Sequence, residues 1–153
     1  MDKVSKEVRS GIMRKIHSAN NKSTERRFKA GMIKAGLRGW KTHPDTIFNP
    51  DFIFEDNKLA IFIDGCFWHR CPICNKMPAS NLQYWDDKFE KNIDRDIKAK
   101  DKLTEEGWVV IRFWEHEVRN SLSECISKLK MELECCKSRY TSESKTNFLS
   151  VIY

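Results

Sequence analysis

The chain has 153 residues, 40% of them hydrophobic, and its 28 Lys and Arg against 22 Asp and Glu give a formal net charge of +6. This length suits a single domain with a real core, and no apolar run approaches the ~20 residues that a membrane-spanning helix needs. The charged N-terminal stretch does not resemble a secretory signal, so we expect a cytoplasmic protein whose thiols stay reduced. The basic excess favours a polyanionic partner such as nucleic acid, although a basic enzyme without such a partner has the same charge.

The first predicted element is a basic helical arm over residues 1–20, in which apolar side chains recur at near-helical spacing among lysines and arginines. We expect this arm to fold over a partner rather than into the core. A single domain is predicted for residues 21–136. Its first helix begins at a capping Ser23, carries Glu25 in its first turn, and ends near Gly36.

Three strands are predicted next, near residues 39–43, 51–54 and 59–64. The short connection between the second and third strands predicts an antiparallel pair. The third strand is a near-continuous apolar run, which is typical of a strand that is buried on both faces. The chain then turns at Gly65, where a glycine permits a sharp bend.

A long helix is predicted over residues 81–106, followed by a strand over 108–113 and a helix that includes residues 122–133. The tail, residues 137–153, shows no clear period and is expected to be irregular. This order of elements predicts an α/β protein with a mixed sheet flanked by helices. The long helix is expected to bury one apolar stripe, formed by Leu82, Trp85, Phe89, Ile93 and Ile97.

Six cysteines in a reducing compartment point to metal binding or reactivity rather than to disulfides. Cys66, Cys71 and Cys74 follow the third strand, and the two-residue gap in Cys-Pro-Ile-Cys lets one tight turn supply two zinc ligands. His116, just past the fourth strand, completes a Cys3His set if the third and fourth strands are neighbours. Four protein ligands predict a structural zinc site; a redox CxxC pair and unrelated buried thiols are the alternatives.

A carboxylate and an imidazole are expected to meet at one end of the predicted sheet. Asp51 begins the second strand, and the backbone carbonyl of Ile63 is expected across from it, so the two can share a hard cation such as Mg²⁺. His69 can act as the base that activates water for phosphodiester hydrolysis. The alternatives are that Asp51 simply starts a strand and that His69 is a zinc ligand or a packed ring.

Three aromatic residues near the cysteines can form an exposed wedge: Phe67, Trp68 and Trp85. Aromatic side chains that enter a duplex separate and unstack its base steps. Burial in the core is the alternative. Because Phe67 and Trp68 are adjacent, one face of an extended segment can hide only one of them.

Several of these residues fall in strings that resemble the very short patch repair (Vsr) DNA mismatch endonucleases. The similarity spans about residues 8–129 in order, and the string Gly-Cys-Phe-Trp-His is specific to that family. The strings are Pro-Asp51-Phe, Asp64-Gly-Cys-Phe-Trp-His69, Cys71-Pro-x-Cys74, Tyr84-Trp85, Lys88…Asn92…Arg95-Asp96, Gly107-Trp108-Val and Trp114-Glu115-His116.

The resemblance implies a restriction-endonuclease-like fold and an enzyme that nicks one strand beside the thymine of a T·G mismatch, which arises when 5-methylcytosine deaminates. It implies that Asp51 and the carbonyl of Ile63 bind Mg²⁺, that His69 is the general base, and that Glu25 lies near the active site. It implies the same zinc set, and a helical arm that clamps DNA. The implied DNA contacts are Met13, Phe67, Trp68, Trp85, Lys88 and Asn92.

One position departs from the pattern, because some members carry a second active-site histidine where this chain has Asp64. An acid cannot serve as the same neutral or cationic partner for a phosphate. We therefore expect Asp64 either to bind metal or to orient His69.

The expected partner is double-stranded DNA with a T·G mismatch, and other mismatch-repair proteins are candidate partners. Nicking of a single strand suits a monomer. Two other functions compete with this prediction. One is a different restriction-like DNA nuclease, and the other is a non-catalytic, zinc-stabilised DNA-binding protein, which would need neither Asp51 nor His69.

Overall fold

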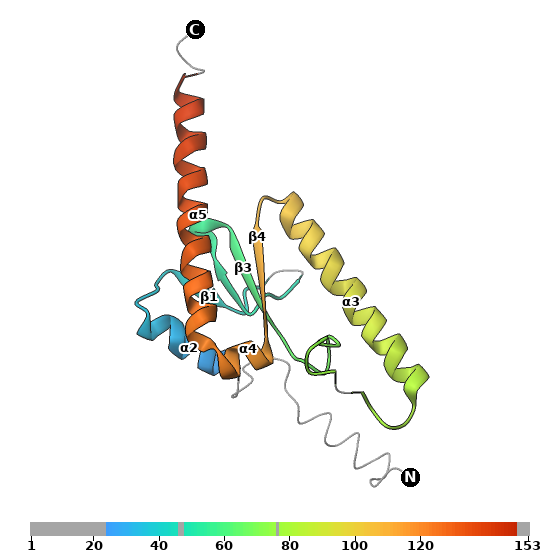
Figure 1. Cartoon of the computed structure of the whole chain (residues 1–153). Helices are drawn as coiled ribbons and strands as arrows, with labels where there is room; N and C mark the ends of the chain where they lie inside the picture. Colours follow the sequence, from blue (N-terminus) through green and yellow to red (C-terminus); the bar gives the residue numbers. More distant parts are fainter. Residues whose placement is uncertain (1–23, 46–47, 76, 150–153) are drawn as a thin grey trace.

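A four-stranded sheet forms the centre of the computed structural model, which describes residues 24–45, 48–75 and 77–149 (Figure 1). The strands lie in the order β1-β2-β3-β4. The β1–β2 and β2–β3 pairs are antiparallel, as predicted for the latter, and β3–β4 is parallel. The sheet is therefore mixed, and its last two strands are neighbours. The strands are β1 (Trp40–Thr42), β2 (Phe52–Phe54), β3 (Leu59–Asp64) and β4 (Val109–Trp114).

Helices cover both faces of this sheet. In Figure 1, α2, α4 and α5 gather on one side of the strands and α3 runs along the other side. This arrangement confirms the predicted mixed α/β architecture. The helical elements are α2 (Glu25–Lys34), the short 3-10 turn η1 (Glu55–Asn57), α3 (Leu82–Glu105), α4 (Glu115–Asn120) and α5 (Leu122–Leu149).

Two apolar clusters hold the layers together because successive side chains of a strand point to opposite faces. On the face of α2 and α5, Leu59 and Ile61 of β3 pack in the larger cluster with Phe28 of α2. On the face of α3, Ala60 and Phe62 pack with Leu103. The strand β3 is thus buried on both sides, as its apolar run predicts.

Glycines follow two of the helices, and Gly36 ends α2 as predicted. Gly36 after α2 and Gly107 after α3 have left-handed φ angles of 75° and 81°, which glycine adopts without strain. The N–H of Leu37 then donates to the carbonyl of Met32 at 3.0 Å, which closes the end of α2. The predicted cap Ser23 and the arm over residues 1–20 lie outside the described residues.

The predicted apolar stripe of α3 is wrong at its first residue, Leu82, which is 53% exposed, and in its C-terminal part. Ile93 and Ile97 are 39% and 54% exposed, whereas Ala99 and Leu103 are each 5% exposed. The stripe that faces the sheet includes the polar Asp96, which is only half-buried. An apolar period misses such a face, because polar residues that pair with each other can occupy buried positions.

The tail expected from Lys137 is helical in the structure, since α5 continues to Leu149. A helix that is already anchored by packing can propagate without a further apolar period, because each added residue gains one backbone hydrogen bond. The short helix α4 between β4 and α5 was not predicted as a separate element.

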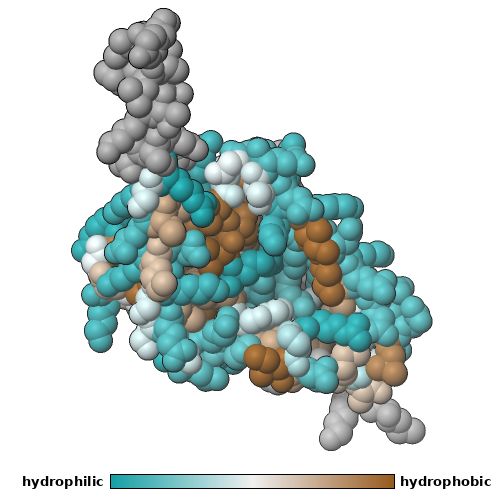
Figure 2. Space-filling view, turned by 45° about the horizontal axis from the view of Figure 1, so that its top comes forward, coloured by the Kyte–Doolittle hydropathy of each residue, from teal (hydrophilic) through white to brown (hydrophobic). Residues whose placement is uncertain are grey.

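The described surface is mostly hydrophilic. Figure 2 shows polar residues over much of one face, interrupted by separate hydrophobic patches. Among the described residues, no helix combines the length and the apolar character that crossing a bilayer would require.

Candidate functional site

Three groups of metal-ligating side chains occur within the described residues, and in each group the ligand atoms lie within 4.8 Å of one another. All three involve the carboxyl end of β3 or residues bonded to it. The groups are Cys66, Cys71, Cys74 and His116; Glu25, His43 and Asp51; and Asp64, His69 and Asp96.

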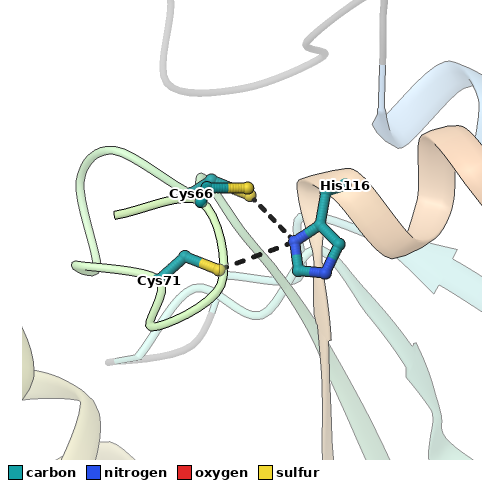
Figure 3. A group of neighbouring side chains, drawn as sticks. Cys66, Cys71 and His116 are labelled. Carbon is teal, nitrogen blue, oxygen red and sulfur yellow. Dashed lines mark hydrogen bonds between the residues drawn. The ribbon is translucent and has the colours of Figure 1, made fainter. Parts of the chain in front are cut away.

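The first group forms where the loop after β3 meets the start of α4. The Cys66 Sγ and Cys71 Sγ atoms lie 3.3 and 3.5 Å from His116 Nδ1, and Figure 3 shows these side chains pointing toward one another. The parallel pairing of β3 with β4 causes this meeting, because the residues that follow both strands emerge at the same edge. The structure thus brings together all four residues predicted as one ligand set.

Backbone groups shape the electrostatics of the cysteine loop. Burial raises the pKa of the Cys66 thiol to about 12. Burial also acts to raise the pKa of Cys71, but hydrogen bonds from the backbone of Cys74 and Ile73 outweigh it and lower that pKa. Such N–H groups stabilise the thiolate, which is the form that binds a metal ion.

The second group lies beside β2 on residues from three separate segments. Glu25 begins α2, His43 follows β1 and Asp51 precedes β2. The His43 Nε2 atom lies 3.1 Å from Glu25 Oε2. His43 has a left-handed φ of 42°, and its N–H donates to the Asp51 carbonyl at 3.2 Å. A non-glycine residue in this conformation is strained, and such strain concentrates at functional sites.

Asp51 is held against β3 by its backbone and by its side chain. Its N–H donates to the Ile61 carbonyl at 2.9 Å, and its Oδ2 accepts a 2.6 Å hydrogen bond from the N–H of Ile63. Because alternate residues of a strand present their N–H and C=O groups to the same neighbour, the Ile63 carbonyl also faces the β2 side. Burial is the main cause that raises the pKa of Asp51 to about 6, with a further contribution from Glu25.

The third group contains the predicted base. His69 Nδ1 contacts Asp96 Oδ2 of α3. Since a carboxylate only accepts, this contact assigns the hydrogen of a neutral ring to Nδ1 and leaves Nε2 as the acceptor. Burial acts to raise the pKa of Asp96, but the contacts with His69 and Arg112 outweigh it and lower that pKa.

Asp64 has a different partner from the one expected. Its two carboxylate oxygens accept hydrogen bonds from Arg112 of β4, at 2.7 Å from Nε and 2.6 Å from Nη2. The expectation that Asp64 orients His69 is therefore wrong for this structure, because Asp96 makes that contact. Asp64 nonetheless lies beside His69 and is only 6% exposed.

The three aromatic residues form one half-buried cluster next to this group. Phe67 packs edge-on against Trp68 and Trp85, with ring centroids 5.2 and 5.0 Å apart. Trp85 also stacks on Phe89, which is fully buried. Gly65 leaves room for Trp68 because it has no side chain, which differs from its predicted role of permitting a sharp bend. Its φ is not left-handed, but a Cβ there would lie 3.1 Å from Trp68 Cδ1.

Two of the other predicted DNA contacts, Lys88 and Asn92, lie on α3. Lys88 is exposed on α3. Asn92 donates from Nδ2 to the Trp68 carbonyl at 2.9 Å, so it ties α3 to the loop after β3. Met13 lies outside the described residues.

Comparison with known proteins gives the family. The family model described as DNA mismatch endonuclease Vsr matches residues 1–76. The type II nicking enzyme V.NmeDIP of Neisseria meningitidis serogroup C is 34% identical over 132 residues, which cover 85% of this chain and 88% of that protein. The chain belongs to the Vsr family.

Two further relatives agree with this assignment. The DNA mismatch endonuclease Vsr of Escherichia coli strain K12 is 33% identical over 116 residues, 74% of this chain and 73% of that protein. The type II nicking enzyme V.NaeI of Lentzea aerocolonigenes is 48% identical over 68 residues, and the chain spans 41% of its length. The resemblance found in the sequence strings is thereby confirmed, and Vsr proteins form a family of DNA-cleaving hydrolases.

The sequence analysis did not predict three residues of the site in this Vsr chain. Asp96 lies between Phe89 and Leu103 at seven-residue spacing, so its position on the buried face of α3 could have been found. Arg112 is a charged residue within an apolar strand, which is a signal for a buried partner. For His43, the sequence offers no signal beyond the residue type itself.

Proposed function

We propose that this Vsr-family chain is a Mg²⁺-dependent endonuclease that nicks one strand of duplex DNA beside the thymine of a T·G mismatch. The observation that carries the proposal is the convergence of two groups on the end of β3. In one group, the Asp51 side chain accepts a hydrogen bond from the backbone N–H of Ile63. The next residue, Asp64, lies beside the His69–Asp96 pair of the other group. Hydrolysis of a phosphodiester needs both a cation site and a base.

The residues around Asp51 fit a hard divalent cation. Asp51 is bonded to the backbone of Ile63, whose carbonyl faces the same side, and Glu25 is close by. Oxygen ligands of this kind are the ones that Mg²⁺ prefers. When bound there, Mg²⁺ would supply charge neutralisation for the attacked phosphate. The raised pKa of Asp51 supports the assignment, since a buried carboxylate without a cation is destabilised.

His69 is proposed as the general base. Its Nδ1 is occupied by Asp96, which fixes the ring and its tautomer. The Nε2 atom is then the acceptor that takes a proton from the attacking water. A carboxylate behind the imidazole also stabilises the imidazolium that forms when the proton is transferred.

The cysteine group fits a structural Zn²⁺. Three thiols and one imidazole nitrogen within 4.8 Å of one another match the ligand types and number of a closed tetrahedral site. We propose that zinc holds the loop after β3 against α4, and that it thereby positions His69 and the aromatic cluster. The ion would contribute folding energy rather than chemistry.

The aromatic cluster is proposed to test the mismatch. Phe67, Trp68 and Trp85 are half-buried, so they combine a packed base with surface that a duplex can reach. Opening a mismatched step costs less than opening a matched step, and stacking on an aromatic ring compensates for part of that cost. Lys88 and Asn92 are proposed to contact the base edges, with Met13 and the N-terminal arm on the other side of the duplex.

Four further expectations from the sequence are part of the same proposal. They are a restriction-endonuclease-like classification of the fold, a cytoplasmic location, a monomeric enzyme, and other mismatch-repair proteins as candidate partners. The relatives named type II nicking enzymes favour one alternative, a restriction-like nuclease that nicks DNA in a different context.

The test uses the purified full-length chain with its native metal content, incubated with a T·G duplex and with its matched T·A counterpart. Asp51→Asn and the exposed control Asp56→Asn are assayed in parallel. We expect nicking of the T·G duplex only with Mg²⁺, at normal rates for the control and not at all for Asp51→Asn. Equal nicking of both duplexes would replace the proposal with the nicking-enzyme alternative, and DNA binding without nicking would leave a DNA-binding protein.

A further inference from the structure

We infer that Arg112 is a positioning residue of the nicking reaction: it engages Asp64, so that Asp96 remains the carboxylate that holds His69. This inference rests on the proposed function, because it concerns the base of that same site. It also gives a role to the acid at position 64, which Arg112 holds at both oxygens.

Two carboxylates compete for one imidazole in this site. The ligand atoms of Asp64, His69 and Asp96 lie within 4.8 Å of one another. Either acid can therefore reach the ring after a small movement, yet only Asp96 contacts it, through Oδ2 and Nδ1. The choice between them determines how the ring is oriented, because Asp64 extends from the end of β3 and Asp96 from the middle of α3.

Arg112 contacts both acids, but in different ways. Arg112 donates two hydrogen bonds of 2.7 and 2.6 Å to Asp64, so both oxygens of that carboxylate have a partner. Its Nη2 atom also lies 3.1 Å from Asp96 Oδ1, which is the oxygen that does not contact His69. Asp64 is thus engaged by Arg112 at both oxygens, and Asp96 is fixed with its second oxygen toward the imidazole.

The sheet fixes the guanidinium in this place. Arg112 pairs with Phe62 in the parallel β3–β4 register, and its guanidinium lies 4.8 Å from the centre of the Phe62 ring. Side chains at residues 62 and 64 point to the same face of β3, so Asp64 stands beside this ring. The fork of an arginine can bond two carboxylates at once from such a stacked position, whereas the single ammonium of a lysine cannot reproduce that geometry.

Removal of Arg112 would leave two carboxylates beside His69 without their shared cation. Asp64 is 6% exposed, so water cannot replace the lost hydrogen bonds. Its carboxylate would then be free to turn to the His69 ring, which is within 4.8 Å, or would repel the phosphate of the DNA. Either outcome slows the chemical step more than it weakens DNA binding, because most binding energy comes from other phosphate contacts.

The primary experiment compares single-turnover nicking of a T·G duplex at saturating enzyme for wild type, Arg112→Met, Arg112→Lys and the control Lys102→Met. Lys102 forms an exposed ion pair with Glu105 near the C-terminal end of α3, so its variant also loses one positive charge. We expect Arg112→Met to slow the nicking step by about tenfold to hundredfold, as displacement of a catalytic group does. Its DNA dissociation constant should change by less than about threefold, and Arg112→Lys should fall in between.

A second variant separates positioning from folding. The double variant Asp64→Asn with Arg112→Met removes the competing carboxylate together with its partner. We expect it to nick at least about threefold faster than Arg112→Met alone, because Asp96 is again the only acid beside His69. Thermal unfolding confirms that each variant is folded at the assay temperature, so a stability loss is not counted as a rate loss.

Three results would overturn the inference: an Arg112→Met rate within about threefold of wild type, an equal loss in Lys102→Met, or a double variant no faster than Arg112→Met. His69→Ala distinguishes these from failure of the proposed function. If His69→Ala abolishes nicking while Arg112→Met does not slow it, only the role of Arg112 is wrong. If His69→Ala nicks normally, the proposed base itself is wrong.

Discussion

The half-buried carboxylate of Asp51 leads to a prediction that links function to stability. Replacing Asp51 by Asn keeps the shape of the side chain and an oxygen that can accept the hydrogen bond from Ile63. It removes the negative charge that the proposed Mg²⁺ site needs. We expect this variant to lose nicking and, without added Mg²⁺, to be more stable than wild type near pH 8.

The sign and size follow from the pKa of Asp51, which burial raises from 3.8 to about 6. A carboxyl whose pKa is higher in the folded state favours folding while protonated, so its contribution is lost as the pH rises through about 6. A pKa shift of one unit corresponds to about 1.4 kcal/mol, so the ionised Asp51 destabilises the fold by about 3 kcal/mol at pH 8. The difference shrinks to about 1 kcal/mol at pH 4.5.

Thermal unfolding followed by circular dichroism measures this effect. The protein is kept free of added Mg²⁺ and of chelator, so that the cysteine group is undisturbed. For a chain of this size, about 3 kcal/mol raises Tm by roughly 6–12 °C. The control Asp56→Asn lies at an exposed position of η1 and should change the stability by less than about 0.5 kcal/mol.

Two results would refute this reasoning. Equal melting temperatures for wild type and Asp51→Asn at pH 8 would show that the ionised carboxylate is well solvated or already paired. A stabilisation of the same size at pH 4.5 and pH 8 would show that its origin is packing rather than charge.

Four further predictions concern other residues of the site. Cys71→Ser should lose about one Zn²⁺ per chain by elemental analysis and melt at a lower temperature, and an unchanged metal content would contradict the zinc assignment. His69→Ala and Asp96→Asn should slow nicking by about 10²–10⁴-fold and about 10–10²-fold, with DNA binding retained in titrations. Trp68→Ala should weaken T·G binding about tenfold or more at fixed salt, and an equal loss on matched DNA would make Trp68 a core residue. His43→Gln should reduce Mn²⁺ affinity more than Mg²⁺ affinity in calorimetry, because imidazole favours transition metals; equal losses would exclude His43 as a ligand.

The sequence predicts the strands better than it predicts the faces of the helices. The apolar run at residues 59–64 and the turns around it are strong local signals, and the observed β3 has the same bounds. On α3, by contrast, the apolar Ile93 and Ile97 lie outside the buried stripe, and Asp96 lies within it. The period fails there because the helix faces a polar site and not a uniform core.

For the site residues as well, contacts between residues close in the sequence are easier to predict than contacts between distant ones. The cysteine set is predictable because three ligands are close in sequence and the fourth follows a neighbouring strand. The partner of His69 is 27 positions away on another element, so sequence proximity alone points to Asp64 and misses Asp96. The contact of Arg112 with Asp64, which leaves Asp96 for the ring, depends on the β3–β4 register that places Arg112 beside Phe62.

We propose that this Vsr-family chain cleaves one chosen strand at a mismatch. The most direct test is a duplex with a single T·G pair whose two strands carry different fluorescent labels, incubated with the enzyme and Mg²⁺ and resolved on a sequencing gel. We predict one product, from the T-containing strand, that ends at the phosphate beside the mismatched thymine. Products from both strands, or the same product at the same rate from a matched T·A duplex, would show that the enzyme does not select the mismatched strand.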